Sequence, residues 1–403
     1  MNAGLRPGSS YFSNHMLKAI TNSLLTPLQL IIRDSRSLGI ILMACAAISM
    51  IISNSAFGGT YIGMWLHEFH FPPAIHLPHS VLHWINDGLM AIFFFLVGME
   101  IKRELLEGEL ADMRKALLPV FAAIGGMVIP ALFFNGFNKG TDYSHGWGIP
   151  MATDIAFSLG IASILGKRVP VALKVFLTAL AIIDDLGAIA VIALFYGGAM
   201  DWFMLGGTVV VMLMILLLVK KKGSFCIRVL LSLLLWYFVF NSGIHATVAG
   251  VLFAFTIPMK ELSHLEHKLH VPVNFIILPI FALANTAIVL PGNIVDSLNN
   301  TLNYGILAGL VIGKPLGILL FSYLLVQLKW GMLPEGVNWT QMAGVGMLAG
   351  IGFTMSIFIA ALAFTDQASQ DIAKISILIA SLLSVILGSL TLLFFSKRLT
   401  SQP

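Results

Sequence analysis

A pair of adjacent aspartates in an apolar segment constrains this chain more than any other feature. From Phe176 to Phe195 the sequence reads FLTALAIIDDLGAIAVIALF, and Asp184 and Asp185 are its only charged residues. An apolar helix of about 20 residues is long enough to cross a bilayer. A carboxylate at the centre of such a helix costs about 2.5–3.5 kcal/mol on insertion scales, so two of them indicate an ion or proton site rather than an anchor.

The composition places the whole chain in the membrane class. Of its 403 residues, 58% are hydrophobic and 10% are charged, whereas soluble domains have about 25% charged residues. The formal net charge is +4, but the basic residues form no cluster beyond Lys220–Lys222, which argues against a nucleic-acid partner. Cys45 and Cys226 indicate neither a disulfide framework nor a zinc site.

Apolar runs bounded by charges, glycine or proline predict an all-α, polytopic membrane protein with about twelve transmembrane helices. A cytoplasmic leader, residues 1–38, precedes a twelve-helix domain, residues 39–398. Residues 16–33 of the leader fit either a short helix on the membrane surface or a partly disordered segment. The predicted spans are 39–57, 83–102, 116–136, 148–166, 171–196, 203–220, 224–240, 244–258, 273–290, 304–327, 341–365 and 372–395.

The distribution of basic residues supports this layout and orients it. With the N-terminus in the cytoplasm, twenty of the 23 Lys and Arg residues fall on the inner side. Lys139 and Lys374 fall outside, and Lys314 lies within a span. Because cytoplasmic loops carry an excess of Lys and Arg, both termini are predicted to be cytoplasmic.

Two predicted spans contain residues that interrupt a helix. In the fourth span Pro150 precedes Thr153 and Asp154, and in the eleventh a cluster of four glycines precedes Thr354. Proline removes a backbone donor, and glycine lowers the cost of unwinding. The glycines alone would also fit close helix packing. Irregular backbone at membrane depth persists only where protein or a watery cavity encloses it.

The interrupted spans are the central members of two helix triplets, helices 3–5 and 10–12. Equivalent members are seven spans apart, so the triplets have opposite orientations, as in an inverted repeat with a binding site near the midplane. We expect the interrupted helices 4 and 11 to cross there. Asp154 would then lie beside the positive half-helix N-termini and Lys314 beside the negative C-termini.

The charged groups at membrane depth predict competition between protons and a small cation. Asp184 and Asp185 cannot both ionise cheaply in a low dielectric. Together with Thr153 and Asp154 they offer oxygen ligands suited to sodium or lithium. The alternative is a buried structural pair satisfied by Lys314 and backbone amides, but one lysine does not neutralise three aspartates. An ion pair of Lys314 with either Asp184 or Asp185 is expected.

Two charged runs are predicted on the cytoplasmic side. One ends the second span, and the other, HLEHKLH, lies between spans eight and nine. Histidines among carboxylates titrate near neutral pH, so the two runs together could sense internal pH. Each run alone is equally explained as a solvated helix end. The residues concerned are Glu100, Arg103, Glu104 and Glu107 in the first run and His264, Glu266, His267, Lys268 and His270 in the second.

Seven motifs together resemble the NhaA-type sodium/proton antiporters, over nearly the whole chain from about residue 39. They are ATDIAFSLG, LTALAIIDDLGAIAVIA, LVGMEIKREL, NSGIHATVAG, LEHKLH followed by ILPIFALAN, GKPLGI, and AGIGFTMSIFIA. The resemblance implies a secondary active transporter of the bacterial inner membrane. It would exchange cytoplasmic Na⁺ or Li⁺ for external H⁺, electrogenically and under pH control, for sodium and pH homeostasis.

The resemblance also implies roles for individual residues. Asp184 and Asp185 match the pair that binds Na⁺ and protons, Thr153 and Asp154 match the TD of the crossing, and Lys314 matches the lysine that pairs with Asp184. The implied pH-response residues are Glu100, Arg103, Glu104, His245, Glu266 and His267. A homodimer with contacts from the first outer loop, about residues 58–80, is implied, and no cofactor besides the transported ions.

Three other functions fit parts of the pattern. A sodium-coupled organic-solute symporter would need polar side chains that enlarge the cavity, and the spans offer few. An intramembrane aspartyl protease needs aspartates on separate helices, whereas Asp184 and Asp185 are adjacent on one. A pure channel would show flux that is insensitive to an opposing proton gradient. Because no Walker, GxGxxG or HExxH motif is visible, the chain is predicted to be neither an enzyme nor ATP-driven.

Overall fold

The computed structural model describes residues 35–72, 76–221 and 224–395. Within these ranges the regular structure is helical, and the extended pairing is one antiparallel bridge between Glu68 and Ser80. The prediction of an all-α fold is therefore confirmed. Residues 1–34 of the predicted leader, with the segment 16–33, lie outside the described residues.

The helices follow the predicted spans in order, and most of them begin and end within a few residues of the predicted limits. They are α2 (Ser35–Ser53), α3 (Gly58–Trp65), α4 (Val81–Trp84), η1 (Ile85–Leu89), α5 (Met90–Leu106), η2 (Glu109–Ala111), α6 (Met113–Asn138), η3 (Asp142–Met151), α7 (Ile155–Ile164), η4 (Gly166–Arg168), α8 (Val171–Phe195), α9 (Trp202–Lys220), α10 (Phe225–Asn241), α11 (Val248–Thr256), α12 (Met259–Pro272), η5 (Val273–Ile277), α13 (Leu278–Asn285), α14 (Ile294–Leu298), α15 (Thr301–Leu307), η6 (Ala308–Gly313), α16 (Lys314–Gln327), α17 (Trp339–Ala349), α18 (Phe353–Ala363), α19 (Gln367–Leu390) and η7 (Thr391–Phe395).

The lengths of these helices show a multi-pass membrane protein. In the described part of the chain seven helices are long and apolar enough to cross a membrane, or up to nine if each of two bent pairs forms one span. The apolar stretch Ser37–Ser53 of α2 and helix α10 are shorter, and α11 has only 9 residues. At about 1.5 Å per residue, a helix of that length does not cross a hydrocarbon core of about 30 Å. The number twelve therefore stays a prediction.

Two helices begin earlier in the structure than the sequence predicts. The ninth span was expected to start at residue 273, but α12, η5 and α13 form one continuous helix from Met259 to Asn285, so the charged LEHKLH segment is its first part. The twelfth span was expected to start at residue 372, but α19 begins at Gln367, with the Asp366 side chain capping its first turn. Lys374 therefore lies two turns inside the helix and is 2% exposed.

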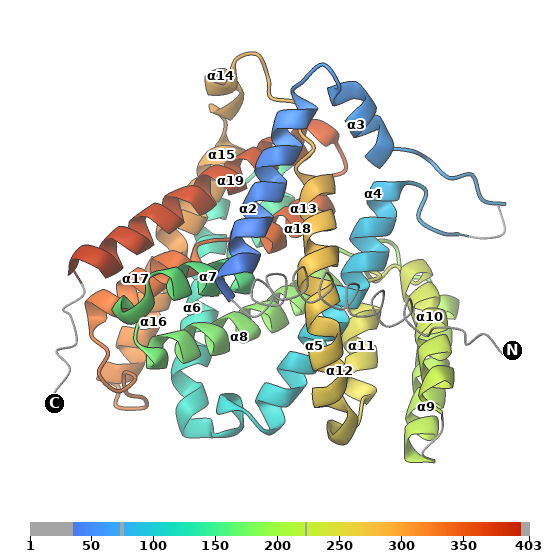
Figure 1. Ribbon diagram of the computed structural model, residues 1–403, viewed down its shortest axis with the longest axis horizontal. Coiled ribbons are helices and arrows are strands. Elements are labelled where there is room, and N and C mark those ends of the chain that lie inside the picture. The colour runs from blue at the N-terminus through green and yellow to red at the C-terminus, as the bar shows by residue number, and fades with distance from the viewer. Residues whose placement is uncertain (1–34, 73–75, 222–223, 396–403) are drawn as a thin grey trace, which may run out of the picture.

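Two broken helices lie at the centre of the molecule. The pair η3 and α7 is bent by 44°, and the pair α17 and α18 by 45°, which confirms the predicted interruptions. In Figure 1, α7 and α18 lie between α19 on one side and the α9–α10 pair at the opposite edge. The breaks coincide with residues 152–154 and 350–352, next to the proline and within the glycine cluster that predicted them.

Close contact between α6 and α16 brings Lys314 to this centre. A Cβ atom on Gly317 would lie 2.1 Å from the carbonyl oxygen of Gly125, so neither backbone leaves room for a side chain there. One turn earlier on α16, Lys314 Cε would lie 3.5 Å from a Cβ on Gly126. The glycines thus let the lysine stem run along the surface of α6.

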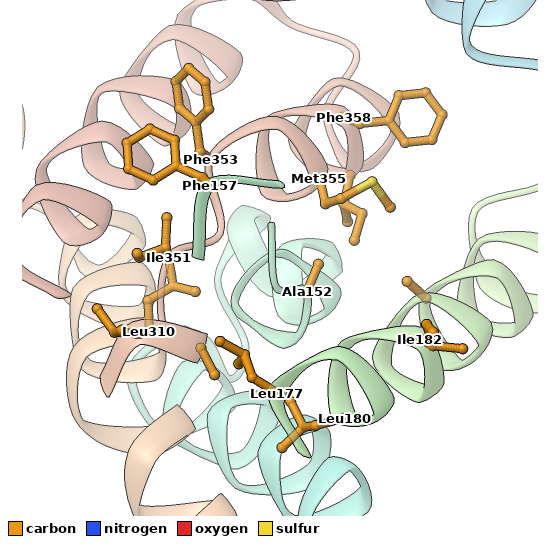
Figure 2. Packing of buried hydrophobic residues seen from close by; sticks show 14 of the residues in the cluster. Ala152, Phe157, Leu177, Leu180, Ile182, Leu310, Ile351, Phe353, Met355 and Phe358 are labelled. Atoms are coloured by element: carbon orange, nitrogen blue, oxygen red, sulfur yellow. The ribbon is translucent and has the colours of Figure 1, made fainter. Parts of the chain in front are cut away.

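Apolar side chains enclose the breaks. Figure 2 shows residues of α8 and of both broken helices gathered around the crossing. The rings of Phe157 on α7 and Phe353 on α18 meet edge to face, with centroids 5.6 Å apart. Leu177 and Leu180 of α8 are also fully buried. The polar groups at the breaks are therefore in a medium of low dielectric, where an unpaired group is costly.

Candidate functional site

The two broken helices satisfy each other's backbone at the crossing. The amide of Asp154, just before α7, donates to the carbonyl oxygen of Ile351 in the other break at 2.7 Å. In return the hydroxyl of Ser356 on α18 donates to the carbonyl oxygen of Ile149 in η3 at 2.8 Å. Each break thus supplies partners for the backbone groups that the other one leaves free.

The carboxylate of Asp154 lies between two half-helix N-termini. Its Oδ1 accepts a hydrogen bond from the Phe157 amide of α7 at 2.9 Å. Its Oδ2 accepts from Thr354 of α18, at 3.1 Å from the amide and at 2.6 Å from the hydroxyl. Both helix ends carry partial positive charge, so one buried carboxylate neutralises two of them. The sequence analysis gave Thr354 no role. Its position just after the glycine cluster nevertheless indicates that it lies in the first turn of a half-helix.

Lys314 lies at the opposite pole of the crossing and is fully buried. Its ammonium donates to the carbonyl oxygen of Met151, the last residue of η3, and to Oδ2 of Asp184. The partial negative charge of a half-helix C-terminus and a carboxylate therefore share one cation. The residue pattern alone left the partner open between Asp184 and Asp185, the family resemblance implied Asp184, and the structure places Asp184 there.

The two aspartates have different surroundings. The Thr153 hydroxyl lies 2.7 Å from Oδ2 of Asp184 and 2.9 Å from the carbonyl oxygen of Ala349. The other oxygen of Asp184 and Oδ1 of Asp185 are buried without a hydrogen-bond partner among the described residues. Buried carboxylate oxygens in native proteins normally have partners. These two unpaired oxygens, on consecutive residues of α8, are therefore candidates for binding a proton or a small hard cation.

A cavity of about 330 Å³ reaches Asp185. Asp154 and Thr354 line it beside Asp185, and so do Glu100 and Glu266 from the charged runs, whereas Asp184 is not part of the lining. Asp185 is therefore the member of the pair that faces the cavity. Asp184 lies behind it against Lys314.

The two charged runs meet at this cavity. Arg103 donates from Nε to Glu266 at 3.1 Å and from Nη1 to Glu104 at 2.8 Å. Arg103, Glu266 and Glu100 all line the cavity. Residues separated by 163 positions thus form one charged patch at the same cavity as Asp185.

The two histidines that the resemblance linked to pH response, His245 and His267, do not line this cavity. His267 is exposed on α12 and does not line the cavity, whereas His270 does. His245 belongs to a separate cluster, in which its Nε2 lies 3.2 Å from Oδ1 of Asp87 and the other oxygen of Asp87 lies 2.7 Å from His83. The structure therefore does not bring His245 to the charged patch. The sequence analysis gave Asp87 no role, although an aspartate within the predicted span 83–102 was an available signal.

The Asp154 contacts predict a stability effect. Asp154→Asn replaces one of the two accepting oxygens by an amide donor that would face an N–H group. We therefore expect the free energy of unfolding to fall by about 2 kcal/mol. Thermal unfolding of the detergent-solubilised protein measures it. Asp142→Asn, an exposed acid in η3, is the matched control. Equal melting temperatures for the two variants would contradict the assignment of Asp154 as a double cap.

Known proteins match this sequence over most of its length. Residues 29–392 match the family model described as Na+/H+ antiporter 1. Na(+)/H(+) antiporter NhaA 2 of Flavobacterium johnsoniae is 46% identical over 409 residues, covering 99% of each chain. Na(+)/H(+) antiporter NhaA of Shewanella frigidimarina is 50% identical, covering 87% of this chain and 92% of that one. Among solved structures, the sodium proton antiporter MjNhaP1 of Methanocaldococcus jannaschii aligns with 17% identity and a TM-score of 0.41, over 90% of this chain and 97% of that one.

Proposed function

This chain belongs to the Na+/H+ antiporter 1 family, and we propose that it exchanges cytoplasmic Na⁺ or Li⁺ for external H⁺ across the bacterial inner membrane. The observation that carries the proposal is the pair of unpartnered carboxylate oxygens on Asp184 and Asp185. One of the two carboxylates faces a cavity and the other faces a buried lysine. The relatives that match the chain are named for the same exchange.

The proposed mechanism is competition for a single site under alternating access. When the cavity opens to the cytoplasm, Asp185 and the Asp184–Lys314 pair release protons, and the two carboxylates bind one Na⁺. Movement of the crossed helices then exposes the site outside, where Na⁺ leaves and protons return. Thr153 and Asp154 support the site, Thr153 by donating to Asp184 and Asp154 by joining the half-helices.

Asp185→Asn tests the site directly. The amide has no proton to exchange and no charge for Na⁺, so we expect sodium-dependent proton movement to vanish in everted vesicles. The measurement is proton flux after addition of Na⁺, Li⁺ or K⁺ across a pH series, with the exposed Asp142→Asn as the control. Flux of normal size in Asp185→Asn would refute the role of Asp185.

Electrogenic exchange follows from the number of protons that one ion displaces. Asp185 carries one proton, and the Asp184–Lys314 pair carries the second, because Lys314 loses its carboxylate partner when Na⁺ binds Asp184. Two protons in for one Na⁺ out moves one positive charge inward per cycle. An inside-negative membrane potential would then drive sodium extrusion.

We expect sodium-driven proton flux in reconstituted vesicles to increase when valinomycin and K⁺ collapse the potential that the exchange itself creates. The physical reason is that net charge movement opposes its own continuation in a closed vesicle. The initial rate of pH change is the readout, and the Asp185→Asn protein corrects for leak. A rate that valinomycin leaves unchanged means electroneutral exchange.

Control by pH is the second part of the proposal. Glu100, Arg103 and Glu266 line the cavity that Asp185 faces, and Glu104 holds Arg103. Their charges set the local potential and therefore the local proton concentration at Asp185. The exposed His267 on α12 and His245 in its separate cluster with Asp87 would add to the response through neighbouring charges. Together they adjust the pH range of exchange.

Glu266→Gln is expected to move the pH profile of exchange toward lower pH. Removal of this negative charge also frees the charge of Arg103, so the cavity becomes more positive and disfavours both cations. Because two protons but only one Na⁺ bind in the proposed cycle, proton binding is weakened more, and Na⁺ competes at higher proton concentration. The pH of half-maximal exchange is the measurement. Glu335→Gln, an exposed acid in the loop before α17, is the control. An unchanged profile, or a shift toward higher pH, would contradict this electrostatic role.

The family membership and the charge distribution also support an assembly and an orientation. Contacts through the first outer loop, about residues 58–80, would form a homodimer in the lipid bilayer, which light scattering of the solubilised protein measures. Both termini would be cytoplasmic, since twenty of 23 basic residues then lie inside. The leader, residues 1–38, would be cytoplasmic as well, and protease access from either face of the membrane tests this.

A further inference from the structure

The first turn of α18 depends on a residue outside the two broken helices. A helix that begins in the membrane interior leaves amide donors without helical partners. Asp154 accepts from the amide of Thr354. The preceding amide, that of Phe353, donates to the hydroxyl oxygen of Ser381 on α19 at 3.2 Å. The residue before it, Gly352, has no side chain that could cap the helix.

Phe353 is thereby held at both ends. Its amide is bonded to Ser381, and its ring packs edge to face on Phe157, as Figure 2 shows. The amide of Phe157 is in turn bonded to Asp154. A chain of contacts therefore runs from α19 through the start of α18 to the start of α7.

We propose that Ser381 is a positioning residue for ion exchange. Without its hydroxyl the buried amide of Phe353 has no acceptor, and the first turn of α18 must move to find one. Thr354 is the next residue, so it would be drawn away from Asp154 in the wall of the cavity that Asp185 faces. This inference rests on the proposed exchange and adds to it a residue on the last helix.

Ser384 provides the matched comparison. It lies one turn further along α19, is equally buried, and faces the same break, since a Cβ on Gly350 would lie 2.8 Å from its hydroxyl oxygen. Among the described residues that hydroxyl has no hydrogen-bond partner. Ser384→Ala therefore removes a hydroxyl group from the same region without breaking a hydrogen bond.

The experiment compares Ser381→Ala with Ser384→Ala in proteoliposomes, with Na⁺ as the ion. Ser381→Ala is expected to raise the apparent KM for Na⁺ about tenfold, with the maximal rate per folded protein within about twofold. Ser384→Ala should match the wild type in both. A merely structural serine would lower the amount of folded protein and leave the KM of the remainder unchanged.

Ser381→Cys keeps the shape of the serine side chain, with a larger atom that is a weaker acceptor, so its KM should lie between those of the wild type and Ser381→Ala. It also serves as the readout if Ser381→Ala does not fold. A KM for Ser381→Ala, or in that case for Ser381→Cys, equal to that of Ser384→Ala overturns the positioning role. Absence of sodium-driven proton flux in the wild type would instead overturn the proposed exchange, so the two failures are distinguishable.

Discussion

A helix that is broken inside a membrane must find partners for the backbone groups it frees, because lipid offers none. Here the two breaks lie against each other, and a single carboxylate, that of Asp154, joins the N-termini of α7 and α18. The positions of Thr153, Thr354 and the cavity wall follow from that junction. Polar backbone is thereby gathered at one depth, where it can serve an ion.

The second consequence is an asymmetry within the aspartate pair. The Lys314 ammonium bonds both the end of η3 and Asp184, and close glycine contacts between α6 and α16 allow the lysine to reach that place. Asp185 is left facing the cavity. Two chemically identical side chains in adjacent positions thus have different partners, which suits a site that exchanges protons for a cation in an ordered way.

Much of this architecture was predictable because it depends on local chemistry. Apolar runs predict the helices, Pro150 and the glycine cluster predict the breaks, and charge at membrane depth singles out Asp184 and Asp185. The differences lie in helix boundaries. The charged LEHKLH segment has no apolar signal, so the ninth helix begins earlier than predicted, and hydropathy does not report that Lys374 is buried.

The sequence by itself determined the class of protein, the two breaks and the chemistry of the acidic pair, since each follows from neighbours along the chain. The family resemblance implied the pair of Lys314 with Asp184, whereas only the tertiary structure decided that Thr354 and Ser381 hold α18 and that His245 lies with Asp87. These contacts join residues up to 200 positions apart. Hydropathy and spacing report a residue's own helix face, whereas these bonds depend on how separate helices meet.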